Sequence, residues 1–156
     1  MGAWFRWLRE IWLGRRLLGQ TVERATEVIA IGTVPIFTVS GGRIVVTQIV
    51  GEITIVMQNI PTTLRLQSNP TLGTTSNICA DLDVDLYEDG DLLGITGITA
   101  DGMLPAATGG VVEAQTQGVI VQEGVIDLVA GANNTGSVKW TLKYIPLDNG
   151  ATVTPV

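Results

Sequence analysis

The residues most able to do chemistry form one short acidic run: Asp81, Asp83, Asp85, Glu88, Asp89 and Asp91. Carboxylates at i, i+2 and i+4 open an EF-hand calcium loop, which also needs Gly at position six and Glu at position twelve. Those positions hold Leu86 and Leu92, so the EF-hand pattern fails. A simpler calcium site at Asp81, Asp83 and Asp85 stays open. We favour a solvated or partner-facing strand whose charge discourages aggregation.

The amino-acid composition excludes several other classes of catalytic site. The 156 residues include no histidine, which excludes Ser-His-Asp and Cys-His catalysis, HExxH metalloproteases and ordinary zinc sites. No GxxxxGK or GxGxxG phosphate-binding motif occurs. A carboxylate pair for glycoside hydrolysis stays open, although few Trp or Tyr residues are left to line a sugar cleft. We therefore expect a protein that is not an enzyme and that binds no cofactor.

The single cysteine, Cys79, lies in the apolar context NICADL. One cysteine forms no intramolecular disulfide, so a secreted disulfide scaffold is excluded. No basic residue adjoins the thiol to lower its pKa, and we expect a small buried hydrophobic side chain rather than a reactive one.

The N-terminal 20 residues show the period of an amphipathic helix. Apolar side chains recur at i, i+3, i+4, i+7 and i+8, with arginines mostly opposite. The segment is too short and too charged to span a bilayer and lacks a signal-peptide cleavage site. It can pack on its own domain, dock on a neighbouring protein or lie in a membrane interface, and we favour docking. The candidate anchor residues are Trp4, Phe5, Trp7, Leu8, Ile11 and Trp12.

Charge divides the chain into two unlike parts. Residues 1–24 carry five arginines and two glutamates, a net charge of +3, and the remainder has a net charge of −9. The acidic β region argues against nucleic-acid binding. Only 15% of the residues are charged, which is low for a protein whose whole surface meets water, so we expect a partner to cover part of it.

The β region is organised around residues 43–58, the longest run rich in β-branched side chains. Apolar residues on both faces predict a central strand or strand pair, with a bulge or bend at Gly51. Strict alternation predicts further strands over residues 80–87 and 138–144. Turn sequences at residues 40–42 and 88–91 predict hairpins.

Turn signals recur at intervals of roughly 8–12 residues, with eight to ten short strands between them, which is typical of a sandwich or barrel. We therefore predict an all-β fold, an antiparallel, jelly-roll-like β-sandwich with an N-terminal amphipathic helical arm. The expected divisions are an arm over residues 1–27, a sandwich over 28–147 and an exposed tail over 148–156.

Several segments, in order, resemble a family of small β-rich structural proteins of tailed bacteriophages. They include VTQIVGEIT, LRLQSNPTLGTTSNICADLDV and NTGSVKWTLKYIPLDNGA, and the resemblance covers roughly residues 36 to 153. It implies a virion component of the head decoration or fibre type; residues 1–20 lie outside the resemblance.

The sequence thus leads us to expect a virion structural protein. The favoured form is a capsid decoration or cement protein, trimeric, docked through its arm on the major capsid protein or other virion proteins, without nucleic-acid or membrane partners. The alternative is a head or tail fibre or spike that binds a host glycan or receptor. A cell-surface or secreted hydrolase is a third possibility, disfavoured by the lack of histidine and of any nucleophile motif.

Overall fold

The structure is a computed structural model that describes residues 19–106 and 110–156. Within these ranges the chain forms twelve strands, and no helix is long and apolar enough to cross a membrane. The strands are β1 (Gln20–Val28), β2 (Gly32–Ser40), β3 (Ile44–Ile55), β4 (Thr63–Pro70), β5 (Ser76–Asn77), β6 (Leu82–Asp83), β7 (Leu92–Gly94), β8 (Leu104–Ala106), β9 (Val119–Val121), β10 (Gly124–Ala130), β11 (Ser137–Pro146) and β12 (Thr152–Pro155).

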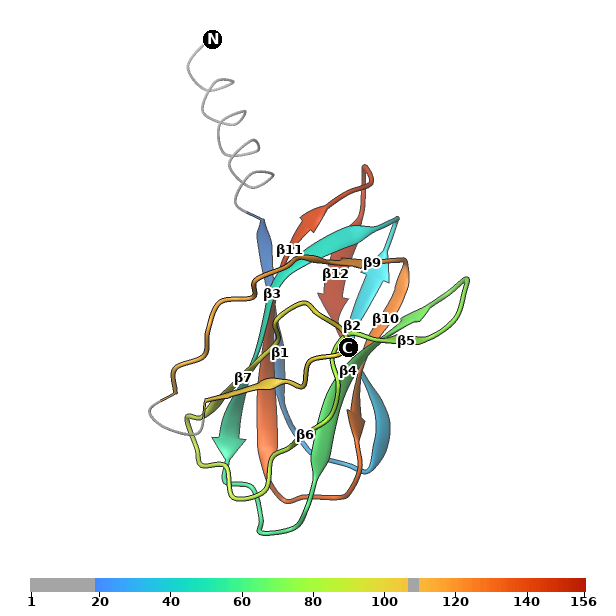
Figure 1. Ribbon diagram of the computed structural model, residues 1–156. Helices are drawn as coiled ribbons and strands as arrows, with labels where there is room; N and C mark the ends of the chain where they lie inside the picture. The colour runs from blue at the N-terminus through green and yellow to red at the C-terminus, as the bar shows by residue number, and fades with distance from the viewer. Residues whose placement is uncertain (1–18, 107–109) are drawn as a thin grey trace.

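The strands form two antiparallel sheets that share one core (Figure 1). The first sheet has the order β1-β11-β3-β7-β8, with β9 also paired to β3. The second has the order β12-β2-β10-β4-β5, with β6 also paired to β4. The chain crosses from one sheet to the other at each step from β1 to β4 and again from β9 to β12. The predicted all-β, two-sheet architecture is confirmed.

The central position of β3 is also confirmed, because β11 pairs with one side of it and β7 and β9 with the other. The predicted bulge at Gly51 is wrong. Register shifts between β3 and β11 fall at Ser137/Val138 and Lys143/Tyr144 instead. Gly51 is needed for close packing, since a Cβ atom there would lie 2.9 Å from Cη2 and Cζ3 of Trp140.

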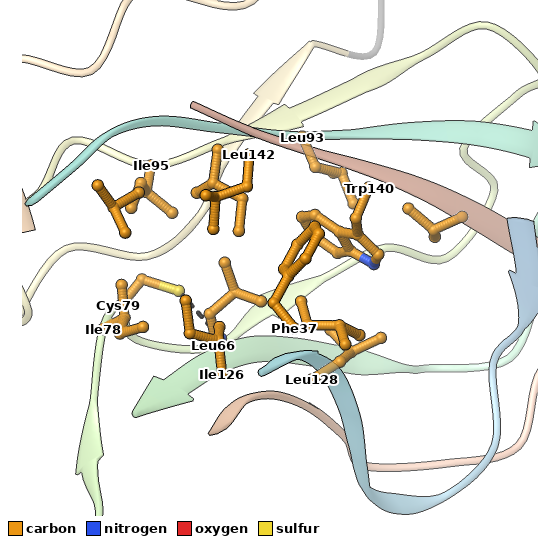
Figure 2. Packing of buried hydrophobic residues seen from close by; sticks show 14 of the residues in the cluster. Phe37, Leu66, Ile78, Cys79, Leu93, Ile95, Ile126, Leu128, Trp140 and Leu142 are labelled. Atoms are coloured by element: carbon orange, nitrogen blue, oxygen red, sulfur yellow. Dashed lines mark hydrogen bonds between the residues drawn. The ribbon is translucent and has the colours of Figure 1, made fainter. Parts of the chain in front are cut away.

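Strand β11 has the predicted alternation, with one face in the core. Figure 2 shows Trp140 and Leu142 of this strand among side chains of β2, β4, β7 and β10. Cys79 is 1% exposed and belongs to the same core, as predicted, and its Sγ accepts a hydrogen bond from the Leu66 amide at 3.3 Å. Its burial raises the pKa of the thiol.

Both predicted hairpins are wrong. Residues 40–42 lead from β2 in the second sheet to β3 in the first, and residues 88–91 lead from β6 in the second sheet to β7 in the first. The strand predicted over residues 80–87 is reduced to Leu82–Asp83, because the chain turns soon afterwards. Leu86 there has a φ of 63° and is exposed, a conformation that ends an extended strand.

Two predicted divisions also change. Residues 20–27, which we assigned to the arm, belong to β1, so the arm extends no further than residue 19. Residues 148–156 are not an exposed tail, because β12 pairs with β2 and buries Ala151 and Val153. Small and β-branched side chains there complete the core, which a local pattern of four strand residues does not reveal.

Candidate interaction surfaces

The sandwich has two unlike ends. At the end we call the arm end, the described chain begins beside Tyr144, which pairs with Gln20. Figure 1 shows several turns at this same, upper end: residues 41–43, 71–75, 122–123 and 147–151. The opposite end, the far end, carries the connections at residues 29–31, 56–62, 84–91 and 131–136.

Six exposed apolar side chains lie at the far end, whereas the arm-end turns expose Leu72 and Leu147. Val28 and Ile55 both pair with Ser137, so they flank the first residue of β11. The Met57 amide donates to the Tyr87 carbonyl at 2.8 Å, which brings the chain around residue 86 beside residue 56. At 52% to 60% exposure, most of these side chains are more than half solvated. We call the set the far-end patch: Val28, Ile31, Ile55, Val56, Ile60 and Leu86.

Asn134 holds the loops of the far end together. Its buried side chain accepts hydrogen bonds from the amides of Gln58 at 2.9 Å and Gly136 at 3.0 Å. Its amide nitrogen donates to Thr62 Oγ1 at 3.1 Å. The run of two asparagines in the sequence was the available signal for this role, because Asn side chains commonly satisfy loop backbone groups.

The far end is also acidic. Among the described residues, the salt bridges are Arg24–Glu27, Arg43–Asp148, Arg65–Asp81 and Lys139–Glu23. None of them involves Asp83 of β6 or the carboxylates between β6 and β7, namely Asp85, Glu88, Asp89 and Asp91. The apolar far-end patch is therefore bordered by unneutralised negative charge.

The candidate calcium ligands are not brought together. Asp81 pairs with Arg65 at 3.0 Å. Asp83 accepts hydrogen bonds from the backbone amides of Thr62 and Asp85 at 3.0 and 3.2 Å, so it shapes the turn. Within the described ranges, no group of three or more His, Cys, Asp or Glu residues is arranged to hold a metal ion.

A cleft at the arm end is closed on one side by an ion pair. Arg43 donates to Asp148 through Nε, Nη2 and its backbone amide, at 2.8 to 2.9 Å. These hydrogen bonds, from the side chain first and then the backbone, hold the pKa of Asp148 well below its ordinary value. The sequence predicts an exposed tail over residues 148–156 and therefore gives no sign of this pair. The cleft has a volume of about 390 Å³ and is lined by Gly42, Arg43, Thr71, Leu72, Gln122, Glu123 and Asp148.

A second cleft of about 210 Å³ adjoins the first through Gln122, which lines both. Its lining combines the apolar side chains of Pro70, Ile78, Val119 and Ile120 with hydroxyl and amide side chains: Ser68, Thr74, Ser76, Asn77, Thr99 and Gln122. Such groups donate and accept hydrogen bonds without carrying charge, which suits a neutral polar ligand.

The predicted anchor residues, from Trp4 to Trp12, lie outside the described residues. The described part of the chain begins at Gly19, beside the Tyr144 carbonyl.

Comparison with known proteins identifies no family. No protein-family model and no curated protein matches the chain. One solved structure, titled "Structure of infectious bursal disease virus Gx strain", aligns at a TM-score of 0.24 and 13% identity. The alignment covers 86% of this chain and 33% of that chain, so this protein spans about a third of its length. That similarity is too low to indicate a shared fold.

Proposed function

We propose that this chain is a non-enzymatic structural protein of a bacteriophage virion, a capsid decoration or cement protein that docks through its N-terminal arm. One observation carries the proposal: the arm leaves one end of the sandwich, and exposed apolar side chains occupy the other. Large apolar surfaces on soluble proteins mark places where partners bind. A molecule with a contact surface at each end is suited to bridge its neighbours in a shell.

The strand order supports a finer assignment of the fold. Four-strand groups β1-β11-β3-β9 and β2-β10-β4-β5, with the chain alternating between them, correspond to a jelly roll. Jelly rolls occur in viral capsid proteins, and also in lectins and cupins, so the fold does not select the function. The resemblance of residues 36–153 to structural proteins of tailed phages favours the virion.

Electron microscopy of phage particles made with and without this chain tests the proposal. We expect uniform added density over the capsid, lost when residues 1–18 are deleted. The truncated chain is expected to keep its melting temperature, because the two sheets and their core lie within residues 19–156. If phage particles made in the presence of this chain do not contain it, the proposal is overturned.

The alternative, a fibre or spike that binds a host glycan, is favoured by the two adjoining clefts at the arm end. Their hydroxyl and amide side chains are suited to sugar hydroxyl groups. Density confined to a vertex or the tail, together with glycan binding that Gln122→Ala abolishes, would select this function. Val56→Ala, at the opposite end, is the matched control and should leave glycan binding unchanged.

A further inference from the structure

We infer that the arm of one copy of this chain docks on the far-end patch of a second copy, giving head-to-tail association. The inference rests on the proposed function and deepens it, because it names a binding partner for the arm. Three observations support it: the chemistry of the two surfaces, their charges and their places on the fold.

The two surfaces match in chemistry. The apolar stripe predicted for the arm presents Trp4, Trp7 and Trp12, aromatic side chains that bury large areas and dominate interface energetics. The far-end patch offers aliphatic side chains that are already more than half exposed, such as Ile31 and Leu86 at 60% each. Packing aromatic rings on these side chains removes both sets from water.

The two surfaces are opposite in charge. Residues 1–18 carry four arginines and one glutamate, a net charge of +3. The border of the far-end patch carries Asp83, Asp85, Glu88 and Asp89, and no salt bridge among the described residues neutralises them. Because the remaining body is also acidic, a second copy is repelled except where the basic arm is presented. Complementary charge of this kind steers association and sets orientation.

The positions favour a second copy over the same copy. The far-end patch begins at Val28, the last residue of β1, about 26 Å from Gln20 at roughly 3.3 Å per residue. As the predicted helix, residues 4–19 span only about 23 Å at 1.5 Å per residue. Folded back, the stripe would lie beside β1 over most of its length, and only Trp4 would come near Val28 at the edge of the patch. An arm that points outward presents its whole stripe to the far end of the next copy.

The contact joins two different surfaces, so an open assembly keeps one free arm at one end and one free patch at the other until it closes. Such head-to-tail contacts form a ring where the rotation closes and a filament where it does not. A closed ring of three copies is the form consistent with the trimer expected from the sequence. Light scattering measures the molar mass of such a ring in solution directly.

A complementation experiment with the full chain tests the inference. The first variant, Trp7→Glu with Trp12→Glu, has a defective arm and an intact patch. The second, Val56→Asp with Ile60→Asp, has an intact arm and a defective patch. We expect size-exclusion chromatography with light scattering to show concentration-dependent oligomers for the unchanged chain. Each variant alone should be monomeric, and an equimolar mixture should form a one-to-one dimer.

Two controls keep the result interpretable. Val156→Asp alters an exposed valine, 59% exposed, beside the middle of β2 and away from both ends, and should leave association unchanged. The second control reverses surface charges and leaves the core unchanged. Asp85→Lys with Asp89→Lys should weaken self-association at least tenfold. Adding Arg6→Glu and Arg9→Glu to the same chain should restore it.

Monomers of the unchanged chain at all concentrations, or a mixture of the two variants that stays monomeric, would overturn the inference. Self-association measured on purified protein is separate from particle binding. If the arm still attaches the chain to capsids while no oligomer forms, head-to-tail docking fails and the proposed function stands. If oligomers form but never bind particles, head-to-tail docking stands and the proposed function fails.

Discussion

The indole ring of Trp140 on β11 lies against the backbone of Gly51 on β3, and a Cβ atom at position 51 would approach two of its ring carbons to 2.9 Å. Both residues sit in the middle of paired strands, and Trp140 is 1% exposed, so neither has room to move. We expect Gly51→Ala to lower the free energy of unfolding by about 1–3 kcal/mol, the usual cost of overpacking a core. Urea denaturation measures this change.

A double-mutant cycle assigns that cost to the ring. Phenylalanine at position 140 lacks the outer carbons that the new methyl group would strike. Gly51→Ala should therefore cost less in a Trp140→Phe background than in the unchanged chain. Equal costs in both backgrounds would mean that the glycine is required for another reason.

Asn134 satisfies loop backbone groups at the far end, so its removal should be costly. Asn134→Ala leaves the amides of Gln58 and Gly136 without their acceptor and is expected to destabilise the protein by about 2–4 kcal/mol. Asn134→Asp keeps the oxygen that accepts from both amides and loses the bonds that Nδ2 donates to Thr62 Oγ1 and to the Gln58 carbonyl, so it should cost less than Asn134→Ala. Chemical denaturation of both variants checks the order. Asn133→Ala, which removes one exposed bond to Ile31, is the matched control.

The ion pair of Arg43 with Asp148 makes stability depend on pH. The pKa of Asp148 is lowered in the folded chain by the hydrogen bonds from Arg43. The pair therefore stabilises the fold fully above the unfolded pKa of about 3.9, and this contribution is lost as pH falls through the lower, folded value. Asp148→Asn should be less stable than the unchanged chain at pH 7, with the difference shrinking at pH 2. Arg43→Gln should show the same convergence.

Cys79 should be protected from thiol reagents in the folded state. Its side chain is buried, and desolvation raises the pKa of the thiol, so little thiolate is available at pH 8. We expect labelling by a disulfide reagent to be slow in buffer and complete within the mixing time in denaturant. Fast labelling of the folded protein would show that β4 and the segment carrying Ile78 separate readily.

Calcium should not stabilise the protein through Asp81, Asp83 and Asp85. One of these carboxylates pairs with Arg65, and another accepts bonds from backbone amides. We expect the melting temperature to be the same in millimolar calcium and in chelator. A rise in calcium that Asp83→Asn removes would contradict this expectation.

The hydrophobic periodicity of the sequence was sufficient to predict a strand wherever that strand buries one face. The alternation over residues 138–144 correctly predicted a strand, whose buried face carries Trp140 and Tyr144, and the β-branched run predicted the central position of β3. These features are local, because a side chain's direction follows from its neighbours along the strand.

Connections between strands were not predictable in this way. A turn such as residues 40–42 has the same local chemistry whether it closes a hairpin or crosses to the facing sheet, and here it crosses. The partners of Asp83 and Asn134 are also distant in sequence: Thr62 lies 21 residues from Asp83, and Gln58 lies 76 from Asn134. The metal candidates and the far-end patch depend on such distant pairings, so sequence spacing could not place them.

The pairing of β1 with β11 has a consequence for biosynthesis. Gln20 meets Tyr144, whose hydroxyl donates to it across 124 positions of the chain. At the usual pace of translation, the two are made roughly 6 to 25 s apart. During that interval the tryptophan-rich start of the nascent polypeptide emerges from the ribosome while its adjoining strand has no sheet to join. Chaperone supply and slow expression at low temperature should therefore govern the yield of soluble material.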